Sequence, residues 1–190
     1  MKNTARWILF GVAIAAQLAV PVSMIVGSED ILASGVRYHF RTRPVDPEDA
    51  FRGKYVALGF EETSCAVDTM LRFKTHQKAY ALIARDDSGF AQVTGLTPRR
   101  PAHGDYVKVV VTSFRRGWVD FRYPFEKYFL EEENAPRAEG LYREHNLGGN
   151  QDTYVVVRVK NGAAVIEDLV IGGLPVREAL RQDAAKTGAE

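Results

Sequence analysis

The sequence contains very little cysteine, and its single cysteine, Cys65, excludes a disulfide bond within the chain. A set of paired cysteines is the usual sequence sign of a domain that folds in an oxidising compartment. Because only one cysteine is present, cysteine usage indicates neither the compartment nor the side of a membrane. Location has to be inferred from the distribution of hydrophobic and charged residues.

The chain also lacks an excess of charge of either sign, since it has 25 basic and 24 acidic residues. Without Lys2 and Arg6, which lie near the N-terminus, the remainder has 23 basic and 24 acidic residues. Domains that bind nucleic acids usually carry a basic stripe or a strongly basic surface. We therefore do not expect nucleic acid as a partner.

Sequence patterns of the common enzyme and metal sites are missing as well. The four histidines are scattered, and no two of them have the spacing of a metal-binding pair. The chain has neither a glycine-rich phosphate-binding loop nor the nucleophile elbow of a hydrolase. We expect no metal and no other cofactor. The sequence leaves enzymatic activity open and favours a noncatalytic protein.

One long hydrophobic run is present, and it begins at Trp7 and ends at Val26 without a charged residue. As a helix rising about 1.5 Å per residue it spans about 30 Å, which predicts one crossing of a bilayer. A cleaved signal peptide is the alternative, but its apolar region is usually only about 7 to 15 residues long. The length therefore favours an uncleaved anchor. Pro21 predicts a kink or compensation by a neighbouring helix in the membrane.

The charges that flank the run predict its orientation. Lys2, Arg6 and the terminal amine precede it, which favours an N-terminus in the cytoplasm. Three arginines, at positions 37, 41 and 43, argue for the opposite orientation, but they lie near the limit of the distance over which this rule applies. Because long domains cross the membrane largely regardless of their charge, we expect the rest of the chain to lie outside the cytoplasm.

The pattern divides the chain into an anchor over residues 1–27, one domain over residues 28–183 and a disordered tail over residues 184–190. Short runs of β-branched and aromatic residues alternate with turn residues, so the domain is predicted to be mainly β. We expect an antiparallel sheet or a partly open barrel with one or two short helices. The strands are expected at residues 36–41, 55–61, 79–85, 90–96, 106–114, 118–123, 154–159 and 163–171.

Turn residues indicate hairpins at 86–89, 115–117 and 161–162, the last being the Asn-Gly pair that favours a type I′ turn. Residues 131–147 interrupt the alternation and are predicted to form a loop with at most a short helix. A further helix is expected at residues 176–183, after a Gly-Gly pair and a proline.

Two blocks contain the candidate site residues. The first, residues 43–60, reads RPVDPEDAFRGKYVALGF, and it places Asp46, Asp49, Arg52 and Tyr55 at the rim of a possible binding surface. The structural alternative is a rigid turn in which Asp, Pro and Gly serve the backbone alone. Both interpretations remain open from the sequence.

The second block contains Glu126, Tyr128 and Glu132 in a run of aromatic and acidic residues. A carboxylate beside a phenol is able to serve acid-base chemistry, and alternation would put Glu126 and Tyr128 on one face of a strand. Burial next to Phe125 and Tyr128 would raise the pKa of Glu126. The alternative is a solvated acidic loop after a core aromatic pair, which is the more common role of charge runs.

These two blocks resemble the GDYXXLXY-domain family of bacterial membrane-anchored proteins. The first block has Gly53-Lys54-Tyr55 where the family signature has Gly-Asp-Tyr, followed by Val56, Leu58 and Phe60 in the expected alternation. The segment Phe125-Glu126-Lys127-Tyr128-Phe129 with Glu132 is similar to the second block of the family. The charged lysine in place of the aspartate is neither a hydrogen-bond acceptor nor a metal ligand.

The resemblance implies a single-pass anchor in the bacterial cytoplasmic membrane and a β-rich domain that is periplasmic or extracellular. It also implies a multi-pass membrane protein as a possible partner, but it supplies no activity. The leading hypothesis is therefore a noncatalytic accessory or interaction subunit. One alternative is an envelope hydrolase that uses Glu126, Asp46 and a nearby tyrosine. Another is a cell-wall glycan-binding module that uses exposed Trp118, Tyr123 and Tyr142.

Overall fold

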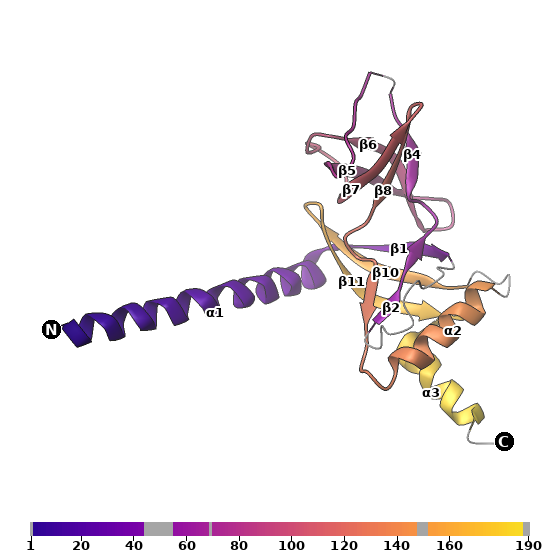
Figure 1. Ribbon diagram of the computed structural model, residues 1–190. Helices are drawn as coiled ribbons and strands as arrows, with labels where there is room; N and C mark the ends of the chain where they lie inside the picture. Colours follow the sequence, from indigo (N-terminus) through magenta and orange to yellow (C-terminus); the bar gives the residue numbers. More distant parts are fainter. Residues whose placement is uncertain (1, 44–54, 69, 148–151, 188–190) are drawn as a thin grey trace.

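A single long helix extends from the β-rich part of the chain in the computed structural model, which describes residues 2–43, 55–68, 70–147 and 152–187 (Figure 1). This helix, α1 (Lys2–Ser34), continues without a break through Pro21. Its segment Arg6–Ser34 has a mean hydropathy of 2.2 over its most apolar window and is not buried by the rest of the chain. By length and composition α1 is compatible with anchoring the protein in a membrane.

The sheet that follows α1 is called here the proximal sheet. It is antiparallel and has the strand order β12-β11-β10-β1-β3. Its strands are β1 (Val36–Arg43), β3 (Gly59–Phe60), β10 (Tyr154–Lys160), β11 (Ala163–Ile171) and β12 (Leu174–Pro175). The hairpin between β10 and β11 turns at Asn161 and Gly162, which have φ angles of 53° and 81°. Positive φ at both positions is the requirement of a type I′ turn, so the predicted hairpin is confirmed.

The second sheet, called here the distal sheet, lies on the other side of β1 from α2 and α3 (Figure 1). It has the order β4-β8-β7-β5-β6 and is also antiparallel. Its strands are β4 (Ser64–Ala66), β5 (Lys78–Arg85), β6 (Ala91–Thr97), β7 (Tyr106–Arg115) and β8 (Trp118–Arg122). A short ribbon of β2 (Tyr55–Ala57) and β9 (Lys127–Phe129) completes the strands of the described residues.

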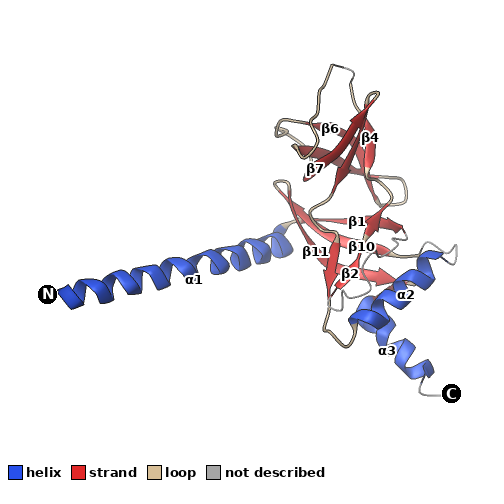
Figure 2. Cartoon of the chain, viewed as in Figure 1, coloured by secondary structure: helices blue, strands red, loops and turns tan. Residues whose placement is uncertain are grey.

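Two helices lie beside the proximal sheet, and among the described residues the distal sheet has none (Figure 2). They are α2 (Ala135–Leu147) and α3 (Val176–Thr187). The fold class is therefore confirmed: a mainly β chain with antiparallel sheets, an N-terminal apolar helix and two further short helices.

The two sheets share one hydrophobic core. At its centre the ring of Phe40 on β1 contacts the rings of Phe60, Tyr123 and Phe125 at centroid separations of 5.2 to 6.1 Å. All four residues are at most 5% exposed. Because β1 belongs to the proximal sheet and Tyr123 follows β8 of the distal sheet, this cluster joins the two sheets.

Residues 131–147 were predicted to form a loop with at most a short helix, and the helix is longer than this prediction, because α2 occupies thirteen of these residues. Gly140 and Pro136 favour a loop in the sequence. However, Ala135, Ala138 and Tyr142 recur at helical spacing and are each at most 3% exposed. Burial of this face against the rest of the domain outweighs the weak local helix propensity.

Other boundaries differ from the expectations. The strand expected at residues 55–61 is two strands, β2 and β3, which pair with different partners on either side of Leu58. The short strands β4, β9 and β12 were not expected as strands. Helix α3 continues to Thr187, four residues beyond the expected end at 183, because alanine and lysine in this stretch are good helix formers.

Candidate interaction surface

Of the seven candidate site residues, Asp46, Asp49 and Arg52 lie outside the described residues. The other four are Tyr55, Glu126, Tyr128 and Glu132. Tyr55 begins β2, Glu126 immediately precedes β9, and Tyr128 is the middle residue of β9. Glu132 is exposed in the turn before α2. The ribbon of β2 and β9 therefore brings the tyrosine of the first block next to the second block.

The pairing of β2 with β9 decides which side chains share a face. Tyr55 is opposite Phe129, and Val56 is opposite Tyr128. The ring of Tyr55 lies 5.6 Å from that of Phe129, and the Lys127 ammonium lies 4.6 Å from the centre of the Tyr55 ring. Because side chains alternate along a strand, Tyr55 and Tyr128 lie on opposite faces of the ribbon. The outer face carries Tyr55, Lys127 and Phe129.

Glu126 and Tyr128 have separate partners. The Glu126 carboxylate lies 3.3 Å from Nε of Arg122, and burial raises the pKa of Glu126 while Arg122 opposes the rise. The Tyr128 hydroxyl donates a hydrogen bond of 3.3 Å to Oδ1 of Asp168 on β11. Burial, followed by the Asp168 carboxylate, raises the pKa of Tyr128 to about 12. The phenol is therefore protonated at neutral pH and holds β9 against β11.

A groove of about 350 Å³ opens between β9 and β11. It is lined by Pro124, Phe125, Lys127, Tyr128, Phe129, Ala164, Val165 and Ile166. Seven of these eight residues are apolar or aromatic, and Lys127 is the one charged residue among them. The ring of Phe129 is 68% exposed, which is unusual for a large aromatic side chain outside a membrane helix.

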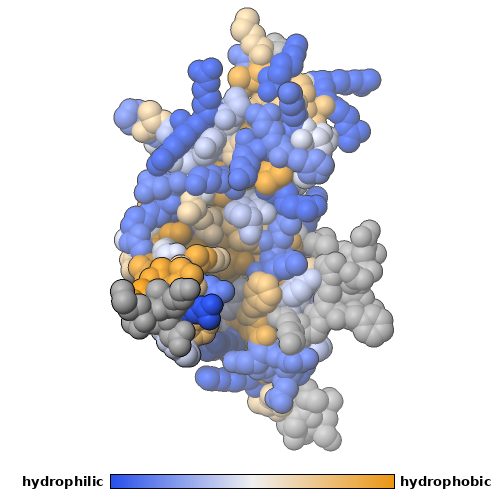
Figure 3. Space-filling view, turned by 60° about the vertical axis from the view of Figure 1, so that its left-hand side comes forward, coloured by the Kyte–Doolittle hydropathy of each residue, from blue (hydrophilic) through white to orange (hydrophobic). Residues whose placement is uncertain are grey.

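The groove lies at the end of the proximal sheet that adjoins α1. Ala164 in β11 pairs with Val159 in β10, and Val159 pairs with Val36, the second residue after α1. At about 4.8 Å per strand, Ala164 is about 10 Å from the start of β1. Figure 3, which turns the α1 side forward, shows hydrophobic residues beside the emerging helix within a mainly hydrophilic surface.

The groove is not predicted by the sequence patterns described above, although the sequence contains two signals for it. The residues Ala163 to Ile166 form a run without the alternation of a strand that has one solvated face. Phe129 stands at an outward position of β9, where a polar residue is the usual choice. Neither signal shows from the sequence that these two segments lie side by side, because that depends on the long-range packing of β9 and β11.

The aromatic residues considered for glycan binding are mostly buried. Tyr123 and Tyr142 are each only 3% exposed, whereas Trp118 is 56% exposed. The Tyr123 hydroxyl donates to the carbonyl of Glu62, and the Tyr142 hydroxyl donates to the carbonyl of Arg43. The expectation that these three residues form an exposed set is therefore wrong, because two of them belong to the core.

Within the part of the chain that the structure describes, no three His, Cys, Asp or Glu side chains gather as they would at a metal ion. His145 on α2 has Asp152 as its partner, with Nδ1 at 2.9 Å from the carboxylate. Cys65 is buried, and burial raises the pKa of its thiol. A thiol in this environment is a poor nucleophile at neutral pH.

Comparison with known proteins decides the family. The family model described as GDYXXLXY protein matches residues 17–169, which include the second half of α1, α2, and both sheets except β12 and the last two residues of β11. The chain belongs to the GDYXXLXY protein family. Neither the curated proteins nor the solved structures give a match. The GDYXXLXY match covers Tyr55, Glu126, Tyr128 and the whole lining of the groove, but it gives no activity.

Proposed function

We propose that this chain is a noncatalytic accessory subunit, anchored by α1 in the bacterial cytoplasmic membrane, whose groove between β9 and β11 binds a multi-pass membrane protein. The domain over residues 28–183 is proposed to lie outside the cytoplasm. The observation that supports this function is the apolar groove with its exposed Phe129, which opens beside the foot of an apolar helix. An exposed apolar surface of this kind is typical of a protein-binding site.

The proposed occupant is an apolar segment of the partner where one of its spans leaves the bilayer. A partner in the same membrane would present such a segment near the groove, because Ala164 of the groove lies about 10 Å from the start of β1, next to the end of α1. The apolar side chains of α1 are exposed in this chain, so they are available to lipid or to a neighbouring span. Groove and helix would thus form one continuous interface.

The separate partners of Glu126 and Tyr128 support a noncatalytic role. Acid-base catalysis needs the two groups within reach of one reacting atom. Here Arg122 is the partner of Glu126, and Asp168 on another strand is the partner of Tyr128. A hydrolase that combines Glu126 with Asp46 remains the alternative function, with Asp46 outside the described residues.

Photocrosslinking in native membranes tests the proposal. The photoreactive residue p-benzoylphenylalanine replaces Phe129 in the full chain, and mass spectrometry identifies what is crosslinked after illumination. We expect one membrane protein with several apolar spans. The matched control places the same photoreactive residue at Trp118, which is also an exposed aromatic residue but lies in the distal sheet. We expect no such adduct at this position.

A second variant, Phe129→Ser, separates binding from folding. We expect it to fold with an unchanged melting temperature and to lose co-purification of the crosslinked protein. Lipid adducts alone at position 129 would overturn the proposal. Equal crosslinking of the same protein at positions 129 and 118 would also overturn it, because the groove would then have no special role.

A further inference from the structure

The junction between α1 and the domain is tied by several hydrogen bonds. Only Gly35 separates α1 from β1, and its N-H donates to the carbonyl of Ile31 at 2.8 Å. The Lys160 ammonium lies 2.7 Å from the Asp30 carboxylate and 2.7 Å from the Ser34 hydroxyl. The Arg158 guanidinium donates to the carbonyl of Gly35 at 3.0 Å. The domain is therefore held against the end of α1 without a linker.

This junction fixes the height of the domain above a bilayer. The uncharged run ends at Val26, and α1 continues for eight more residues to Ser34. At about 1.5 Å per residue these residues add about 12 Å, whereas the headgroup region is about 5 to 8 Å thick on each side. With α1 inserted along the membrane normal, the first residues of β1 lie about 4 to 7 Å beyond the headgroup region, a distance that a lysine or arginine side chain spans.

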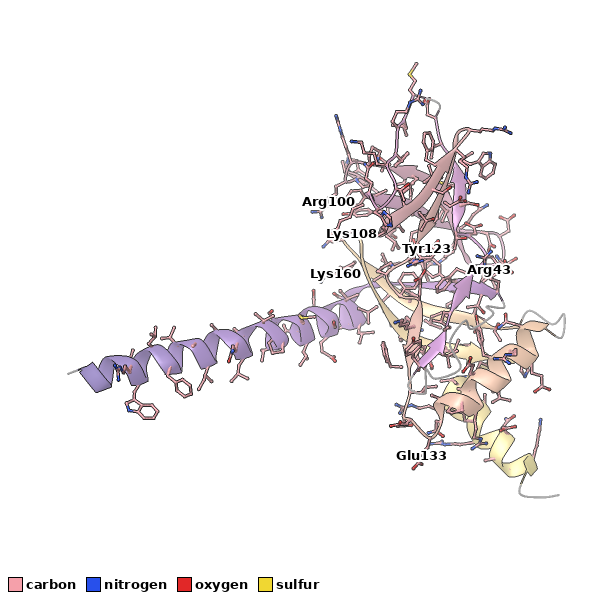
Figure 4. All side chains as sticks on the ribbon, viewed as in Figure 1. Arg43, Arg100, Lys108, Tyr123, Glu133 and Lys160 are labelled. Atoms are coloured by element: carbon pink, nitrogen blue, oxygen red, sulfur yellow. The ribbon has the colours of Figure 1, made fainter. Side chains whose placement is uncertain are left out.

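Three cationic residues, Arg100, Lys108 and Lys160, lie along the side of the domain that faces α1, and they are called here the basic collar (Figure 4). The tip of the β10–β11 hairpin connects them, because Lys160 ends β10 and Gly162 at the tip contacts the segment that contains Lys108. The Lys108 N-H donates to the carbonyl of Gly162 at 2.9 Å, and Gly162 packs directly against the Tyr106 ring. Nε of Arg100 donates to the Tyr106 hydroxyl at 2.7 Å.

The net charge of the collar comes from two of its members. Asp30 balances Lys160, and Glu167 balances the nearby Arg37 and Arg158 in part. Arg100 and Lys108 are exposed, and neither forms an ion pair with a carboxylate among the residues that the structure describes. Arg100 donates to Tyr106 through Nε, which leaves both terminal nitrogens of its guanidinium available to bind a phosphate.

We propose that the basic collar binds the headgroup phosphates of anionic phospholipids in the leaflet from which the domain emerges. A guanidinium binds phosphate oxygens with two parallel hydrogen bonds, and an ammonium adds a point charge beside it. The effect would orient the domain on the membrane with the groove open to the side. This proposal requires insertion of α1 and does not require a protein partner.

The test uses the full chain in lipid nanodiscs of either phosphatidylcholine or a mixture with phosphatidylglycerol. Native mass spectrometry measures how many lipids stay bound, and hydrogen–deuterium exchange measures protection of residues 98–108. Each basic residue near an anionic surface strengthens binding about fivefold. We therefore expect the retention of phosphatidylglycerol to fall by roughly tenfold or more in the Arg100→Gln, Lys108→Gln variant.

The matched control removes two charges from the end of β7 and the turn that follows it, with Arg115→Gln and Arg116→Asn. Arg116 has a φ of 51°, which asparagine tolerates, and Arg115 is about 23 Å along β7 from Lys108. We expect this variant to retain phosphatidylglycerol like the native chain. Lys108→Gln alone, which leaves the Arg100 to Tyr106 hydrogen bond intact, should cause about half of the loss on a logarithmic scale.

Three outcomes would overturn the proposal. One is equal retention of phosphatidylcholine and phosphatidylglycerol by the native chain. Another is the same loss in the control variant as in the collar variant. The third is displacement of the bound lipid by millimolar inorganic phosphate, which would indicate a site for a soluble anion. Because no partner protein is present, the result is independent of whether the groove binds one.

Discussion

The proximal and distal sheets have the same number of strands but are built from different parts of the chain. The distal sheet uses one continuous stretch, from β4 at Ser64 to β8 at Arg122. In the proximal sheet β1 pairs with β10, more than a hundred residues later in the chain. Hairpins between neighbours in sequence form easily, whereas long-range pairing depends on the rest of the fold. The proximal sheet therefore needs additional interactions to hold its strands together.

Those additional interactions are found in the proximal sheet. Two arginines, Arg37 on β1 and Arg158 on β10, converge on Glu167 of β11. A buried network also links β1 to the segment before β10, since Thr42 and Thr153 lie 2.8 Å apart and Thr153 donates to Asn146. The groove borders the proximal sheet, whereas the basic collar spans both sheets, with Lys160 in β10 and Lys108 in β7. The polar interactions that stabilise the proximal sheet thus lie close to both proposed surfaces.

The largest expected effect comes from removing the ring that joins the two sheets. Phe40→Ala is expected to lower the free energy of unfolding by about 3–5 kcal/mol, because a fully packed aromatic ring is lost from the shared core. Urea unfolding of the full chain in detergent micelles, followed by near-ultraviolet circular dichroism, measures the change. Hydrogen exchange should show both sheets opening together, and opening of one sheet alone would contradict a shared core.

Substitutions at two glycines with similar φ angles, Gly162 and Gly89, distinguish the cost of backbone strain from the cost of crowding between the two sheets. Gly162 has a φ of 81°, and a Cβ atom there would lie 2.4 Å from the Tyr106 ring of the distal sheet. Gly89 has a φ of 83° and nothing within 4 Å of such an atom. Gly89→Ala is expected to cost about 1–2 kcal/mol from backbone strain alone.

Gly162→Ala adds overpacking against Tyr106, so its total cost is expected to be about 2–4 kcal/mol. Thermal unfolding of both variants in the same detergent compares them directly. Equal losses of stability would show that the tip of the β10–β11 hairpin does not press on the distal sheet. The comparison is independent of residue type, because both changes are glycine to alanine at a positive φ.

The ion pairs of the proximal sheet predict a dependence of stability on pH. Hydrogen bonds from Arg37 and then from Arg158 lower the pKa of Glu167 from its usual 4.5 to about 2. Because the folded-state pKa is the lower one, this stabilisation is present above about pH 4.5 and is lost as the pH falls toward 2. Glu167→Gln is expected to cost about 1–2 kcal/mol at pH 7, since charge-assisted hydrogen bonds are replaced by neutral ones.

The measurement is the difference in the free energy of unfolding between the native chain and Glu167→Gln at several pH values. This difference should be full at pH 7 and should shrink steadily below pH 4.5. Glu133→Gln, which changes an exposed carboxylate in the turn before α2, is the control and should show no such dependence. A difference that stays constant down to pH 3 would rule out the assigned ion pairs.

The alternation of residues predicted the two sheets well because most of their strands have one core face and one exposed face. The strand predicted at residues 106–114, for example, is β7. Its residues Val107, Val109 and Val111 alternate along the strand and are buried in the core. Asn161-Gly162 likewise predicted its hairpin from local conformational preference alone. Such features depend on neighbouring residues and are therefore readable from the sequence.

Other features depend on contacts between distant segments. The α2 helix has weak local propensity and exists because Ala138 and Tyr142 pack against the domain. The candidate site remains a prediction: the pairing of β2 with β9 brings Tyr55 beside the second block, but Tyr55 is opposite Phe129, and Tyr128 lies on the other face of the ribbon. The groove could not be predicted, because Phe129 and Ile166 are thirty-seven positions apart and only the packing of β9 beside β11 joins them.

The smallest expected effect on stability is at the groove, and it completes the comparison with Phe40. Phe129→Ala makes the same chemical change, but at a ring that is 68% exposed in contrast to 3% for Phe40. We expect a change of less than about 0.5 kcal/mol in the free energy of unfolding. Urea unfolding beside Phe40→Ala measures it. A loss above 2 kcal/mol would mean that Phe129 supports the fold, and its exposure could then no longer be attributed to a binding partner.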